Sequence, residues 1–110
     1  MIRHIVFFSF PDDASAERAA EVLRGYAAIP GVEELEIARN ERRDAWSSEI
    51  DLVLHARFAS VEALDGYKRH PIYLEGTRLV RPTRELRFAA DYAIEAARVE
   101  GALSADAEAA

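Results

Sequence analysis

The stretch "IDLVLHARF", Ile50–Phe58, alternates apolar and polar side chains more cleanly than any other part of the chain. Side chains of a β-strand point alternately to its two faces, so this pattern predicts a half-buried strand. The predicted buried face carries Ile50, Leu52, Leu54, Ala56 and Phe58, and the other face carries Asp51, Val53, His55 and Arg57.

Before this stretch, the sequence predicts a strand, a helix and a second strand. "IRHIVFFSF", Ile2–Phe10, is rich in β-branched and aromatic residues and stops at Pro11. Apolar residues then recur at helical spacing. We expect Asp13 or Ser15 to cap this helix and Pro30-Gly31 to close it. The segment Val32–Arg39 alternates again and predicts a strand.

After this stretch, the sequence predicts a helix, a break, further helix and a last strand. Ser60 is placed to cap a helix whose buried side carries Val61, Leu64 and Tyr67. His70-Pro71 interrupts that helix, and helical character resumes until Pro82. A strand is expected over residues 85–92. The tail, 93–110, is rich in Ala and Glu and is either a helix or a frayed end.

The predicted order is β-α-β-β-α-β, which is the ferredoxin-like α+β arrangement. One antiparallel sheet would then carry its helices on a single face. The other face would expose Ile5, Phe7 and Val53. Exposed apolar patches usually mark an interface, so we expect a homodimer formed by sheet-to-sheet packing.

Composition excludes several classes of protein. The 110 residues carry a net charge of −6, whereas nucleic-acid binding needs clustered positive charge. Arginine recurs in "TRLVRPTRELR", Thr77–Arg87, which we interpret as a solvated face or as ion pairs with nearby Glu. There is no cysteine, and no apolar run is long enough to cross a membrane. A cytoplasmic protein is expected, with no nucleic-acid or membrane partner.

Three kinds of side chain are candidates for chemistry. His4 shares a strand face with Val6 and Phe8, so it is either a hydrogen-bonded core residue or the polar lining of a pocket. His70 either caps the restarted helix or transfers protons. The tyrosines can donate protons but are poor bases at pH 7. No histidine has metal-ligand spacing, and we interpret Trp46 as an interface anchor or a lid.

Several short motifs resemble those of the stress-responsive dimeric α/β-barrel (Dabb) family. They are "IRHIVFFSF" with His at its fourth position in the chain, "AAIPGVEELEI", "ARFASVEALDGY", "YKRHPIY" and the closing "ADY". The motif "YKRHPIY", Tyr67–Tyr73, resembles the family's Y-x-x-H-P-x-H. The match spans residues 1–92, which we take as the domain. The resemblance implies a dimeric α/β barrel that needs no metal or cofactor.

The resemblance also implies candidate site residues. In the related olivetolic acid cyclase, a plant polyketide cyclase, a Tyr and a His of the motif catalyse an aldol condensation in a pocket between sheet and helices. Tyr67 and His70 occupy the motif's Tyr and first His, whereas Tyr73 stands where its last His would be. His4 matches the opening His, and a second pocket His falls at Leu52. We expect catalysis, if any, at His4, Tyr67, His70 and Tyr73, and ligand contact from Tyr26, Leu52 and Phe8.

Two functions follow from these residues. The first is a small homodimeric stress-response-type protein that holds a small apolar or aromatic molecule between sheet and helices, with no reaction assigned. The alternative is a cofactor-independent cyclase, isomerase or monooxygenase that acts on an aromatic or polyketide-like substrate. An enclosed cavity in which Tyr67 and a histidine meet would favour the second.

Overall fold

The computed structural model describes residues 1–94, and the predicted tail from residue 95 onward lies outside them. The elements follow the predicted β-α-β-β-α-β order, with the second helical segment in two parts. The strands are β1 (Ile2–Ser9), β2 (Glu34–Arg39), β3 (Leu52–Phe58) and β4 (Leu86–Ala93). The helices are α1 (Asp13–Arg24), α2 (Val61–Arg69) and α3 (Pro71–Val80), with short 3₁₀ turns η1 (Gly25–Ala28), η2 (Ala45–Ser47) and η3 (Arg81–Thr83).

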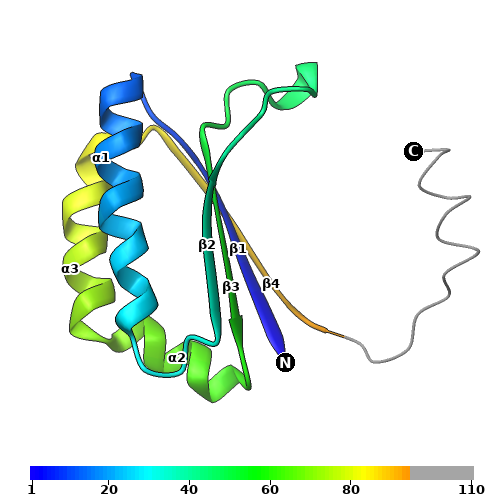
Figure 1. Ribbon diagram of the computed structural model, residues 1–110, viewed down its shortest axis with the longest axis vertical. Coiled ribbons are helices and arrows are strands. Elements are labelled where there is room, and N and C mark those ends of the chain that lie inside the picture. The colour runs from blue at the N-terminus through cyan, green and yellow to red at the C-terminus, as the bar shows by residue number, and fades with distance from the viewer. Residues whose placement is uncertain (95–110) are drawn as a thin grey trace, which may run out of the picture.

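The four strands form one antiparallel sheet in the order β2-β3-β1-β4. All three α-helices cover the same face of this sheet (Figure 1). Small side chains on α1 bring that helix close to the sheet, where Ala16 and Ala20 are fully buried. The core lies between the two layers, and the predicted inner face of β3 is buried throughout from Leu52 to Phe58.

Several local predictions need correction. Asp12 caps α1, because its side chain accepts a hydrogen bond from the Ser15 backbone N–H; neither Asp13 nor Ser15 is the cap. Ser60 caps α2 as predicted. Val61 is exposed, because it lies in the first turn of α2, before the helix reaches the core. Gly31 turns the chain toward β2 with a φ of 92°, a conformation that glycine adopts without strain.

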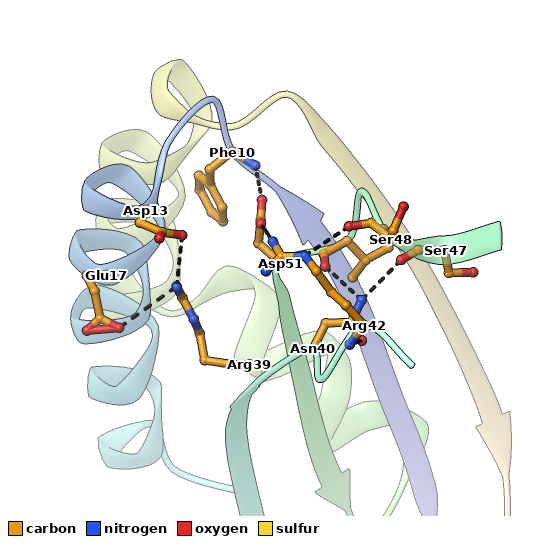
Figure 2. A network of polar contacts seen from close by, with 10 residues as sticks. Phe10, Asp13, Glu17, Arg39, Asn40, Arg42, Ser47, Ser48 and Asp51 are labelled. Atoms are coloured by element: carbon orange, nitrogen blue, oxygen red, sulfur yellow. Dashed lines mark hydrogen bonds and ion pairs between the residues drawn. The ribbon is translucent and has the colours of Figure 1, made fainter. Parts of the chain in front are cut away.

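The segment between β2 and β3, residues 40–51, leaves the sheet on the side opposite to the helices (Figure 1). We call it the Trp46 arm. A polar network fixes its base (Figure 2). The Asp51 carboxylate accepts hydrogen bonds from the Phe10 backbone N–H, at 2.7 Å, and from Arg42. The Asn40 amide donates to the Ile50 carbonyl at 2.8 Å. Asp51 is therefore buried, although alternation predicted it on the exposed face of a longer strand.

Candidate functional site

A cavity lies between the helix-covered face of the sheet and α3. The enclosed part of the cavity is small, with ≈ 20 Å³ available to water centres, which is room for about one water molecule. The empty space around it totals ≈ 340 Å³, which includes solvent outside its open mouth. Polar and aromatic lining comes from His4, Tyr26, Tyr67, Tyr73 and Thr77. Apolar lining comes from Val6, Phe8, Leu23, Leu54 and Val80.

Tyr67 is the centre of the aromatic packing around the cavity. Its ring centroid lies 4.9 Å from that of Phe58, 5.0 Å from Tyr73 and 5.9 Å from His4. The residue is fully buried, yet its hydroxyl has no hydrogen-bond partner within residues 1–94. Burial raises the pKa of Tyr67 far above its usual 10, so the hydroxyl stays protonated. Tyr67 is thus a buried donor that lacks an acceptor.

His4 is held by the last strand of the sheet. It faces Asp91 across the β1–β4 ladder, and its Nδ1 contacts an Asp91 carboxylate oxygen. The other Asp91 oxygen accepts from Lys68 Nζ at 3.4 Å. No hydrogen bond within residues 1–94 uses His4 Nε2. The imidazole is therefore fixed in position with one nitrogen unengaged.

The electrostatic environment keeps His4 neutral. Burial lowers its pKa below the usual 6.5, against the opposite effects of the Asp91 hydrogen bond and charge. Burial of Asp91 alone would raise the pKa of its carboxyl, but the hydrogen bond from His4 and the nearby Lys68 lower it overall. An ionised Asp91 can only accept, so His4 Nδ1 carries the proton and Nε2 carries the lone pair. His4 is thus a neutral imidazole that can act as a base.

Tyr26 contributes its ring to the cavity, while its hydroxyl is tied to α3. That hydroxyl donates to the Tyr73 carbonyl at 3.3 Å and lies 3.5 Å from the Thr77 Oγ1. Burial raises the pKa of Tyr26, so this hydroxyl also stays protonated. The close approach needs a glycine at 76, because a Cβ there would overlap the Tyr26 ring. The Tyr26 hydroxyl therefore links η1 to α3 at one wall of the cavity.

The structure brings some of the predicted site residues together and not others. His4, Phe8, Tyr26, Tyr67 and Tyr73 line the cavity. His70 does not line it. It caps α3, where its Nδ1 accepts from the Ile72 backbone N–H at 3.1 Å. Leu52 is buried on the correct face of β3 but does not line the cavity either; Leu54, one pleat along, does.

Sequence reasoning missed two features of this site. The first is Asp91: strand alternation could have placed it on the helix-covered face of the last strand, but its position opposite His4 depends on the register between β1 and β4. The second is a set of arginines at the cavity mouth. Arg78 forms an ion pair with Glu75, one of the two arrangements expected for these arginines. The three that follow it line the cavity instead, and within residues 1–94 no carboxylate pairs with them: Arg81, Arg84 and Arg87.

Two other kinds of site have no counterpart in the described part of the chain. Within residues 1–94, no three His, Asp or Glu side chains gather in a way that could hold a metal ion. No helix in that range has the length and apolar character needed to cross a membrane.

Solved structures with the same fold come from bacteria and plants. A Dabb family protein with a ferredoxin-like fold from Mesorhizobium loti is 23% identical, with a TM-score of 0.73, over 86% of this chain and 96% of that one. A dimeric ferredoxin-like protein of unknown function from Thermobifida fusca is 22% identical, with a TM-score of 0.73, over 84% and 90%. Hydroxynitrile lyase from Passiflora edulis is 17% identical, with a TM-score of 0.76, over 89% and 96%.

At these identities, the likeness shows a shared fold. A comparison with curated proteins gave no match. The family itself is shown by a sequence model that spans nearly all of the described residues. The model for the stress responsive A/B barrel domain, Dabb, matches residues 2–94, and the chain therefore belongs to the Dabb family.

Proposed function

We propose that this chain forms a homodimer through the bare face of its sheet, and that each copy binds a small apolar or aromatic molecule in the cavity beside Tyr67. One observation carries the ligand proposal: the Tyr67 hydroxyl is buried without an acceptor. A buried donor without a partner costs about 1–3 kcal/mol, and a ligand oxygen would remove that cost. Sites of this kind combine apolar walls with a few directed polar groups.

The uncovered face of the sheet supports the dimer. Phe7 on β1 is opposite Val53 on β3 and Phe88 on β4, which gives an apolar row across three strands. Phe7, Phe88 and Tyr92 are 38%, 60% and 44% exposed in the single chain. A bare apolar face of this kind is typical of an interface. Several solved structures of this fold are described as dimeric, including the one from Thermobifida fusca.

The Trp46 arm adds to this face. Trp46 is 92% exposed. The arm projects from the side of the sheet that no helix covers (Figure 1), and strand alternation places the Phe7 row on that side too. The network around Asp51 and Asn40 gives the arm a fixed base (Figure 2). Tryptophan is enriched where two proteins meet, so in this proposal Trp46 contacts the second copy.

Thermal shift measurements on wild type and Tyr67→Phe test the ligand proposal. We expect small aromatic and apolar compounds with a carbonyl or hydroxyl oxygen to raise the Tm of wild type in a saturable way. The same compounds should raise the Tm of Tyr67→Phe much less, because the donor is gone. Tyr92→Phe removes a hydroxyl on the opposite face and is the matched control. Equal shifts in all three proteins would contradict a site at Tyr67.

The His4–Asp91 pair favours a second candidate function, a cofactor-independent enzyme. Nε2 of neutral His4 could take a proton from a carbon next to a carbonyl, while the Tyr67 hydroxyl donates to the enolate oxygen. This chemistry fits the cyclase or isomerase alternative, and hydroxynitrile lyase from Passiflora edulis shares the fold. NMR of phenylacetone in D₂O tests it: wild type should accelerate exchange at the carbons beside the carbonyl, and His4→Gln should not. Equal exchange rates would exclude His4 as the base.

A further inference from the structure

The cavity has an electropositive mouth in a protein that is acidic overall. Arg81 in η3, Arg84 in the loop after it and Arg87 in β4 all line the cavity. Within residues 1–94, none of them lies within ion-pairing distance of a carboxylate. The net charge of the chain is −6, so unpaired arginines that gather at one cavity are not explained by composition.

The neighbouring Arg78 shows what an ordinary surface arginine does in this chain. Its guanidinium donates two hydrogen bonds to Glu75, at 2.6 and 2.9 Å, and it does not line the cavity. The spacing along the sequence is the same for all four arginines, so sequence periodicity does not separate Arg78 from the other three. Their positions in the fold do separate them, because Arg81, Arg84 and Arg87 line the cavity and Arg78 does not.

The charges at the mouth act on one another and on the cavity interior. Burial lowers the pKa of Arg84, and the adjacent charges of Arg87 and Arg81 lower it further. Burial raises the pKa of both Tyr26 and Tyr67 inside the cavity, and the positive charge of Arg87 acts in the opposite direction on each. Guanidinium groups that repel one another are stabilised by an anion placed between them, and their planar donor sets match a carboxylate.

We propose that the ligand is a small organic anion, a carboxylic acid with a compact aromatic or apolar body. The arginines at the mouth would hold the carboxylate, and the rings of Tyr26 and Tyr73 would contact the body. The Tyr67 hydroxyl would donate to an oxygen at the inner end. The enclosed part holds about one water-sized group, such as that oxygen, so the ring or short chain of the ligand would lie in the open part of the cavity near the arginines. This inference rests on the proposed function, because it assigns a ligand class to the same cavity.

Isothermal titration calorimetry with 4-hydroxybenzoate tests this class. The probe carries a carboxylate, one ring and an oxygen at the far end. Arg84→Gln removes a charged donor to the carboxylate, so it should weaken binding by about tenfold or more. Arg81→Gln changes a more exposed arginine of the same group and should also weaken binding. Arg78→Gln is the matched control and should bind as wild type does.

Two further titrations sharpen the result. The neutral analogue 4-hydroxybenzamide should bind wild type more weakly than the acid does, and Arg84→Gln should remove that difference. Inorganic phosphate should bind much more weakly than the acid, because it has no apolar body. Equal loss in Arg78→Gln and Arg84→Gln, or phosphate that binds as tightly as the acid, would overturn the inference.

Failure of this inference can be told apart from failure of the proposed function. If 4-hydroxybenzoate bound in a Tyr67-dependent way, with equal affinity in wild type and Arg84→Gln and no advantage over its neutral amide, the anion class would be refuted and the small-molecule site would stay in place. If no compound, charged or neutral, bound in a way that depends on Tyr67, both proposals would be wrong.

Discussion

The two faces of β1 differ in almost every property although their residues alternate along one strand. His4, Val6 and Phe8 point toward the helices and are buried. Ile5 and Phe7 point the other way, onto a face that no helix covers. The inner face holds ionisable and hydroxyl groups within an aromatic core, whereas the centre of the outer face is an apolar row. One strand therefore serves a candidate site and a candidate interface at once, because the pleat separates them.

The largest expected effect comes from truncation of the inner face. Phe8→Ala removes a buried ring that packs on Phe10 and lines the cavity. Large-to-small changes of this kind cost about 3–5 kcal/mol of unfolding free energy. Urea denaturation should show this loss at any protein concentration. Phe7→Ala, one residue away, should instead give a loss that grows on dilution, because Phe7 would be buried only in the dimer. Equal, concentration-independent losses would break the distinction between the faces.

A charge on the outer face should separate the two copies without unfolding them. Phe88→Glu places a carboxylate in the apolar row, at a position that is 60% exposed in the single chain. Light scattering should report about twice the chain mass of 12.3 kDa for wild type and the single mass for the variant. Leu74→Glu changes an equally exposed leucine on α3 and should stay dimeric. A wild-type monomer at micromolar concentration would refute the interface.

The inner face should make stability sensitive to mild acid. Burial lowers the pKa of His4, so below the unfolded value of 6.5 the unfolded chain binds more protons than the folded one, and stability falls as pH falls. Burial is the main cause; the hydrogen bond and charge of Asp91 oppose it, and the charges of Lys68 and Arg87 add to it. Tm should drop between pH 7 and pH 5 in wild type and drop less in His4→Gln. His55→Gln, on the outer face, should follow wild type. Parallel curves for all three would contradict a neutral buried His4.

The smallest expected effect is a gain in stability on removal of the Tyr67 hydroxyl. Tyr67→Phe removes a hydroxyl that has no partner within the described residues, and release from that cost should stabilise the ligand-free protein by about 1 kcal/mol. Differential scanning calorimetry at pH 7 would measure this. Together with the ligand test above, the gain would show a group kept for binding at the expense of stability. A loss of about 1 kcal/mol instead would indicate that a cavity water already satisfies the hydroxyl.

Most of the fold was predictable because its signals are local. The alternation in Leu52–Phe58 and the cap at Ser60 depend on residues a few positions apart. His70 is a similar case, since its capping of α3 follows from its place before Pro71. The two errors have different causes. Asp12 and Asp13 are adjacent acidic residues, and the sequence did not show which of them caps α1. Asp51 was placed on the uncovered face by alternation, which does not show its hydrogen bond from the distant Phe10 backbone.

The site was less predictable because it depends on register and on what is left unpaired. His4 and Tyr67 could be proposed from the sequence as pocket residues, but nothing local places Asp91 beside His4. The arginines share one spacing, and only the fold separates Arg78, paired with Glu75, from Arg84 at the cavity. The isolation of the Tyr67 hydroxyl is likewise a property of packing.

The pairing of β4 with β1 joins residues 87 positions apart, since His4 is near the start of the domain and Asp91 near its end. Contacts of such long sequence separation slow folding, because a long loop must close before they form. During synthesis, a chain that stops before β4 would have all three α-helices and three strands, but it would lack Arg87, Asp91 and Phe88. Neither the cavity mouth nor the apolar row would be complete. Ligand binding and self-association through these two surfaces would therefore both depend on the last strand to be synthesised.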